Sequence, residues 1–116
     1  MERPYDLEDR TYLFAKECRL YVQKLPKTIS NIEDGKQLIR SSGSVGANYI
    51  EANEKLGDKD LTFRLKIARK EAKESKYWLR LLHELNPEFL VLSENLIYEV
   101  EELRKILSTI ISKTSN

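Results

Sequence analysis

Apolar residues recur at intervals of three and four along four long segments of the sequence, and this spacing constrains the fold more than any other feature. It places the apolar side chains on one face of a helix, whereas a half-buried strand would alternate apolar and polar residues. Residues that end helices separate the segments, namely Pro26, Gly57 and the pair Asn86-Pro87. The sequence therefore predicts four helices, over about residues 6–25, 30–55, 58–85 and 89–112.

Long helices with short connections predict an all-α protein, an antiparallel up-down-up-down four-helix bundle. The 116 residues suit one domain, 1–116. Only four glycines and three prolines are present, which argues against an all-β fold with many turns. Ser30 and Glu33 fit a capping box at the start of the second helix, and Asp58 or Asp60 is placed to cap the third.

Residues 40–52 are unusually rich in Ser, Gly and Ala. A glycine inside a helix costs about 1 kcal/mol relative to alanine, so Gly43 and Gly46 indicate that another backbone approaches closely here. A Ser/Gly loop between two shorter helices is the alternative. Residues 43–46 also match the Gly-x-x-Gly loop of KH RNA-binding domains, but no strands flank them. A phosphate-binding P-loop requires Lys where Ala47 stands.

The third predicted helix has more apolar surface than a single bundle needs. One face carries the predicted core residues Leu61, Leu65, Ala68, Ala72, Ser75, Leu79 and Leu82. A second apolar arc carries Phe63, Ile67, Trp78, Leu81 and Leu85. Such an arc predicts a subunit contact, unless it only widens the core face.

The small residues of the second helix occupy more than one side of it, so they join the predicted oligomer interface. Asn48 and Glu51 share one side of that helix. If that side is covered, Glu51 needs a cationic partner, since an unpaired buried charge is costly. Candidates are Arg40, Lys70 and Lys73. The predicted interface residues are Ser42, Gly43, Gly46, Asn48, Glu51, Phe63, Ile67 and Trp78.

Basic residues fill the remaining arc of the third helix and form the candidate nucleic-acid surface. The net charge is only +1, yet residues 59–80 hold eight basic and three acidic residues, whereas residues 84–105 hold two and six. The basic arc is either a phosphate-binding face, an ordinary solvated face, or a stripe that pairs with the acidic helix of a neighbouring copy. Its members are Lys66, Arg69, Lys70, Lys73, Lys76 and Arg80.

No pattern in the sequence predicts catalysis, a cofactor or a metal site. His83 is the only histidine and Cys18 the only cysteine, which is too few for the paired Glu-x-x-His motifs of di-iron bundles or for a zinc site. Cys18 lies on an apolar stripe, typical of a buried, unreactive thiol. A single cysteine and the absence of a leader or an apolar span favour the cytoplasm.

Two motifs resemble a known family. Residues 40–52 read Arg-Ser-Ser-x-Ser-Val-Gly-Ala-Asn-Tyr-Ile-Glu-Ala, and Phe63, residues 67–75 and residues 77–79 follow. They resemble the small bacterial four-helix-bundle proteins encoded in intervening sequences of 23S ribosomal RNA genes, over roughly residues 7–111. The resemblance implies a ring-like homopentamer. The family includes the accessory variability determinant of diversity-generating retroelements, a basic pentameric barrel that binds nucleic acid and a reverse transcriptase, but most members have no established activity.

The sequence thus favours a non-enzymatic, homo-oligomeric accessory or scaffold protein that binds RNA, DNA or a nucleoprotein partner through the basic arc. The alternative is a structural or regulatory protein–protein adaptor without affinity for nucleic acid. An enzyme with a site at the ring's axis is a remote third. We expect neither a membrane nor a small-molecule substrate as partner.

Overall fold

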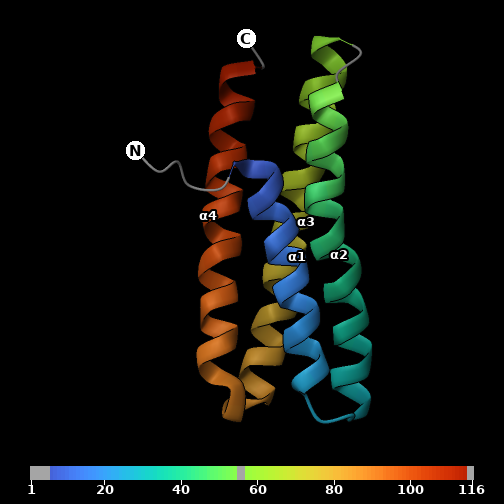
Figure 1. Ribbon diagram of the computed structural model, residues 1–116, viewed down its shortest axis with the longest axis vertical. Helices are drawn as coiled ribbons and strands as arrows, with labels where there is room; N and C mark the ends of the chain where they lie inside the picture. Colours follow the sequence, from blue (N-terminus) through green and yellow to red (C-terminus); the bar gives the residue numbers. More distant parts are fainter. Residues whose placement is uncertain (1–5, 55–56, 115–116) are drawn as a thin grey trace.

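A computed structural model describes residues 6–54 and 57–114, which form four antiparallel helices (Figure 1). Their bounds are α1 Leu7–Lys24, α2 Ile29–Glu54, α3 Asp58–Leu85 and α4 Leu90–Thr114, with a 3-10 turn, η1, at Pro87–Phe89. Each end lies within two residues of the predicted one. Lys55, predicted as the last residue of the second helix, lies outside the described residues. The all-α bundle predicted from the sequence is confirmed.

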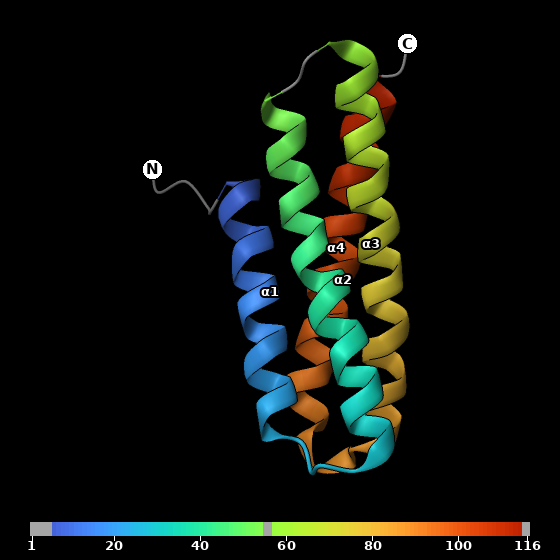
Figure 2. The same cartoon turned by 90° about the vertical axis from the view of Figure 1, so that its right-hand side faces the viewer.

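The helices pack in the order of the chain, so that α1 contacts α2 and α4, and α3 contacts α2 and α4 (Figure 2). The contact between α2 and α3 is the most extensive. The start of α1 lies part-way along α2, so α2, α3 and α4 extend beyond α1 at the end of the bundle that holds the α2–α3 connection (Figures 1 and 2). This end is built from three helices rather than four.

The apolar stripes read from the sequence form the core. On α1 the buried residues are Thr11, Phe14, Cys18 and Tyr21, with Leu25 just after the helix. On α3 the predicted core face is buried from Leu65 to Leu82, and Leu61 packs partly exposed against it. Each fully buried leucine stabilises the fold by roughly 1.5–3 kcal/mol. Helical period alone was sufficient to identify these positions.

The stretch rich in small residues is part of one continuous helix, so the alternative of a Ser/Gly loop is wrong. A Cβ built at Gly46 would lie 2.9 Å from Thr11 Oγ1 on α1. On the α3 side, Ser41 Oγ lies 2.8 Å from Ser75 Oγ, and both residues are fully buried. The close approach that the small residues predicted is therefore made by α1 and α3 of the same chain.

Two predicted helix caps differ from the structure. Ser30 and Glu33 lie inside α2, and Thr28 Oγ1 instead accepts the backbone N–H of Asn31 at 3.1 Å, because the helix starts one residue earlier than predicted. Gly57 is the residue before α3, with φ of 149°, a conformation that favours glycine, and no side chain among the described residues caps that end. Asp58 and Asp60 lie in the first turn, where their negative charges interact favourably with the positive end of the helix dipole.

Candidate nucleic-acid interface

A row of exposed cations runs along the outer face of α3. Lys66, Lys73 and Arg80 occur at intervals of seven residues, and all three side chains are exposed. Within residues 6–54 and 57–114 none of them makes an ion pair or a side-chain hydrogen bond. At 1.5 Å per residue the row spans about 21 Å. Three positive charges on one stripe are thus free to contact a polyanion.

Lys59 extends this row by one more interval of seven and is also exposed without an ion pair within the described part of the chain. It was counted among the basic residues of this segment but was not placed in the predicted site. The signal that would have included it is the seven-residue spacing, which keeps side chains on nearly the same line of a helix. We call Lys59, Lys66, Lys73 and Arg80 the basic row.

The other three predicted basic residues have protein partners. Arg69 donates to Ser108 Oγ on α4 at 3.4 Å. Lys70 Nζ lies 3.7 Å from Glu74 Oε2 on the same helix. Lys76 Nζ lies 3.2 Å from Glu101 Oε1 on α4. The structure brings all six predicted residues to one side of the bundle, but half of them are already engaged.

The acidic helix α4 neutralises part of the basic arc. It does so within the same chain, whereas the sequence had suggested pairing with the acidic helix of a neighbouring copy. Glu101 accepts two hydrogen bonds from Arg104, at 2.6 and 3.1 Å, besides the contact with Lys76. The Arg104 hydrogen bonds, followed by that of Lys76, lower the pKa of the Glu101 carboxyl to about 2. Glu101 therefore stays ionised and holds Lys76 against α4, whereas it makes no ion pair with Lys66, Lys73 or Arg80.

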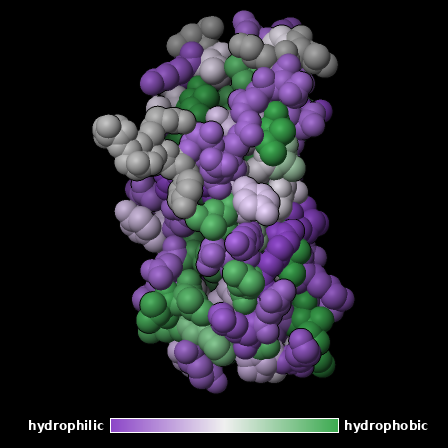
Figure 3. Space-filling view, in the orientation of Figure 1, coloured by the Kyte–Doolittle hydropathy of each residue, from purple (hydrophilic) through white to green (hydrophobic). Residues whose placement is uncertain are grey.

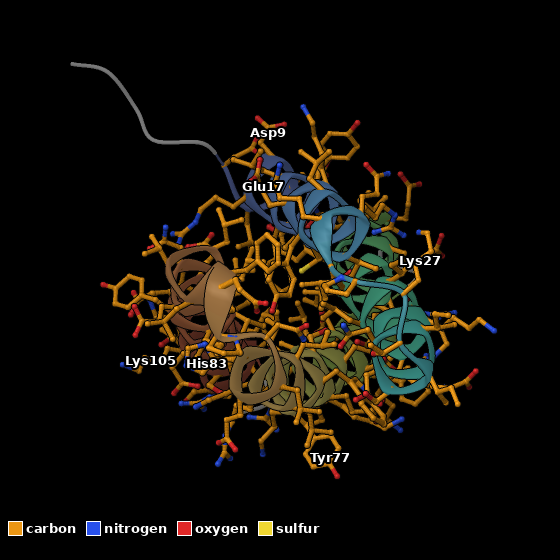
Figure 4. The ribbon with its side chains drawn as sticks, turned by 90° about the horizontal axis from the view of Figure 1, so that it is seen from below. Asp9, Glu17, Lys27, Tyr77, His83 and Lys105 are labelled. Carbon is orange, nitrogen blue, oxygen red and sulfur yellow. The ribbon has the colours of Figure 1, made fainter. Side chains whose placement is uncertain are left out.

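Tyr77 stands in the middle of this surface. Its side chain is 57% exposed, and Figure 4 shows it pointing away from the bundle, on the side opposite Asp9 and Glu17. Its ring packs edge to face against Trp78, with centroids 5.0 Å apart and planes at 80°. Its position on the helix places it within the basic arc, although it is not among the predicted site residues.

Two shallow hollows meet at Tyr77 and Lys73. The first has a volume of about 370 Å³, and its lining is otherwise Lys66, Arg69, Lys70 and Glu74. The second has a volume of about 310 Å³, and its lining is otherwise Lys76, Arg80, Glu101 and Arg104. The exposed ring thus lies between two grooves whose walls are mostly basic.

The predicted interface residues of α2 do not share one surface. Ser42 and Gly46 are buried inside the chain, with Gly46 against Thr11, so no second subunit can reach them. Gly43 is partly exposed, and Asn48 donates to the carbonyl oxygen of Ser44 at 2.9 Å. The small residues of this stretch therefore contribute mainly to packing within the chain.

Glu51 is exposed in the single chain, so it needs no partner there, and its need for one in an oligomer stays a prediction. The buried carboxylate of this region is Glu71 on α3. Arg40 Nη1 lies 3.5 Å from Glu71 Oε1, and Arg40 Nη2 lies 3.1 Å from Glu74 Oε1. Arg40, predicted as a partner for Glu51, instead joins α2 to α3. Glu71 lies one turn after the core residue Ala68. From the sequence pattern alone, Glu71 could equally well have faced solvent.

The second apolar arc of α3 is only partly open. Phe63 and Leu85 are each 58% exposed, at opposite ends of the helix. Trp78 is mostly buried against the core of its own chain, and Ile67 is also partly buried. Trp78 is thus largely covered without a second copy, and the subunit contact stays a prediction that concerns mainly Phe63.

Two further apolar surfaces were not predicted. One covers the first turn of α4, where Val91 is 67% exposed, and appears as the hydrophobic area at the lower left of Figure 3. The other is a groove of about 520 Å³ between α1 and α2, whose lining includes Tyr12, Gly43 and Ile50. Helical period did not predict either surface, because the residues that form each one lie on different stripes.

The residues considered for catalysis lie apart from the basic row. His83 Nδ1 is 2.5 Å from Ser93 Oγ, but Ser93 is fully buried and unable to reach a substrate. Cys18 is also fully buried, and burial raises the pKa of its thiol to about 12. Among the described residues no three His, Cys, Asp or Glu side chains are grouped to hold a metal ion. No described helix has both the length and the apolar character needed to cross a membrane.

The fold and this surface define a small four-helix-bundle protein with a partly neutralised basic face. The chain belongs to the 23S rRNA-intervening sequence protein family, whose profile matches residues 5–109. It is similar to a crystallised protein of unknown function from the S23 ribosomal protein family of Bacteroides thetaiotaomicron, at 30% identity and a TM-score of 0.80. That match covers 91% of this chain and 95% of the other. No curated protein matches the chain.

Proposed function

We propose that this protein is a non-enzymatic accessory or scaffold protein that binds RNA or DNA through the basic row of α3. The observation that supports this best is that Lys66, Lys73 and Arg80 are exposed at regular spacing and unpaired among the described residues, while nearby basic residues are engaged by carboxylates. Such a row is suited to several phosphates along a strand, and each phosphate contact releases a counterion.

The proposal includes a homo-oligomer, for which a pentamer is the expected form, located in the cytoplasm. Repetition of the basic row on several copies would multiply the number of phosphates contacted by one strand. Phe63 supports this part, since an exposed aromatic side chain outside the basic row is suited to a contact between copies. Light scattering on the purified chain should give a mass several times 13.6 kDa. A monomer at micromolar concentration would overturn this part alone.

Binding to nucleic acid is tested by titrating a labelled oligonucleotide over a series of salt concentrations. Affinity should fall as salt rises, with a log–log slope of about −0.7 for each phosphate contacted in a single strand. The triple variant Lys66→Glu, Lys73→Glu, Arg80→Glu should lose most of the affinity and flatten the slope. Its circular dichroism should match that of the parent, because all three side chains are exposed.

A matched control variant distinguishes the effect of charges on α3 from the effect of the total charge on binding. Lys16, Lys24 and Lys27 are also exposed, lie on or just after α1, and make no ion pair within the described residues. Changing these three to Glu lowers the net charge by the same amount but leaves α3 intact. Binding that falls equally in both triple variants, or that is absent at low salt, would contradict the proposal. Absence at low salt would favour an adaptor function, with the apolar start of α4 as its contact surface.

A further inference from the structure

On the basis of the proposed function, we propose that the ligand is a single strand and that one of its bases stacks on the ring of Tyr77. The phosphates on either side of that base would then contact the basic row. Charge alone would bind single strands and duplexes, whereas stacking on Tyr77 would make the surface selective for single strands. It also assigns a binding role to an aromatic residue outside the predicted site.

The placement of Tyr77 is the first support. In the chain it lies between Lys73 and Arg80, and its ring separates the two hollows on this face. A base lying on the ring therefore has a basic hollow on each side of it. Lys66 and Lys73 are available to phosphates in one hollow, and Arg80 in the other.

The packing of Tyr77 is the second support. More than half of the residue is exposed, and its ring packs edge to face, at 80°, against the ring of the mostly buried Trp78, a contact that limits the positions open to it. An aromatic ring held outward in this way loses little conformational freedom when a base stacks on it. Stacking of this kind contributes about 1–3 kcal/mol per base and tolerates any sequence.

Duplexes are disfavoured by the same geometry. In a duplex the faces of the bases are stacked on one another, so a ring on a protein surface reaches only sugar, phosphate and groove edges. A single strand exposes the base faces. The two carboxylates that line the hollows do not repel the strand strongly, since Glu74 pairs with Arg40 and Lys70, and Glu101 with Lys76 and Arg104.

The intrinsic fluorescence of Trp78 can be used to detect this contact. Trp78 is its only tryptophan, and its ring centroid lies 5.0 Å from that of Tyr77. Stacking of a base on Tyr77 should therefore quench or shift the intrinsic tryptophan fluorescence. A ligand that contacts only the basic row through phosphates should leave that emission nearly unchanged.

The test compares three labelled probes by fluorescence anisotropy at fixed salt: a 12-nucleotide oligothymidine, its duplex with oligoadenosine, and an abasic strand of equal length. Tyr77→Ala should weaken binding of the oligothymidine by about 5- to 150-fold. Tyr77→Phe, which keeps the ring, should stay within about twofold of the parent. The duplex should bind Tyr77→Ala as tightly as it binds the parent, and so should the abasic strand. Tyr12→Ala, which removes another exposed tyrosine from α1, is the control.

The outcomes separate the two proposals. If Tyr77→Ala binds oligothymidine as tightly as the parent while the triple Glu variant of the basic row does not bind, the stacking proposal is wrong and the proposed function stands. Loss of binding to all three probes on Tyr77→Ala would also overturn stacking, because it would show a general structural effect. If the triple Glu variant binds normally, the proposed function itself is wrong.

Discussion

Asn31 and Asn86 exchange a reciprocal pair of hydrogen bonds, in which the amide nitrogen of each donates to the amide oxygen of the other, at 2.8 and 2.9 Å. Both side chains are buried, and they join the first turn of α2 to the connection between α3 and α4. Their remaining amide hydrogens go to the carbonyl oxygens of Pro26 and Leu82, each at 2.9 Å. The pair closes one end of the bundle with every amide hydrogen used.

Replacing Asn86 with alanine should destabilise the protein by about 2 kcal/mol, because it leaves the buried side-chain amide of Asn31 with one of its three hydrogen bonds. Urea denaturation followed by circular dichroism measures this as a lower midpoint. Asn95→Ala, at an exposed position of α4, should change the free energy of unfolding by less than about 0.5 kcal/mol. Equal effects of the two substitutions would show that the reciprocal pair contributes nothing specific.

Gly43 and Gly46 should respond oppositely to alanine, although both lie inside α2. A Cβ at Gly46 would meet Thr11 Oγ1 at 2.9 Å and Thr11 Cβ at 3.2 Å, and the latter atom cannot withdraw without moving α1. A Cβ at Gly43 meets only the end of the flexible Arg19 side chain, at 3.2 Å. Gly46→Ala should therefore cost about 1–2 kcal/mol, and Gly43→Ala should gain up to about 1 kcal/mol. Thermal unfolding of the two variants decides this, and a gain in both would refute the close contact at Thr11.

Cys18 should be unreactive in the folded protein. Because burial raises the pKa of its thiol to about 12, a fraction on the order of 10⁻⁴ is thiolate at pH 8, and the thiolate is the reactive form. Labelling by a thiol reagent should therefore proceed only as fast as the bundle opens. The same reagent should react within minutes in concentrated urea. Rapid labelling of the folded protein would show that the α1 stripe is not packed as described.

The ion pairs of Glu101 should give the protein a defined response to acid. Its folded pKa of about 2 lies below the ordinary value of 4.5, so its stabilising contribution is complete above about pH 5 and is lost as the pH falls toward 2. Glu101→Gln should thus lower the free energy of unfolding by about 1 kcal/mol at pH 7, and the difference from the parent should shrink in acid. Glu94→Gln, at an exposed site of the same helix without an ion pair in the described structure, should show no such convergence.

Helical period, proline and glycine predicted the number of helices, their bounds and the core stripes, because these depend on contacts between residues near each other in the chain. The basic arc also followed from period, and with the seven-residue spacing it would have included Lys59. The ion pair of Lys76 and the hydrogen bond of Arg69 did not follow, since their partners Glu101 and Ser108 are 25 and 39 residues away. That pairing depends on how α3 and α4 align.

The placement of the small residues shows a second limit. Gly46 and Ser42 correctly indicated a close neighbour, but period does not tell whether that neighbour is another helix of the same chain or a second copy. The structure places Thr11 against Gly46. The burial of Glu71 was not predicted for a related reason, because the width of a buried face depends on the size of the residues opposite it.

The unequal lengths of the helices give the bundle a polarity. One end has all four helices and the paired asparagines, whereas at the other end α2, α3 and α4 continue without α1 (Figures 1 and 2). Fewer neighbours around the backbone there mean that its amide hydrogens are protected by a smaller opening free energy. Solvent deuterium should accordingly enter from the three-helix end and advance toward the asparagine end, so that the molecule loosens from one side only.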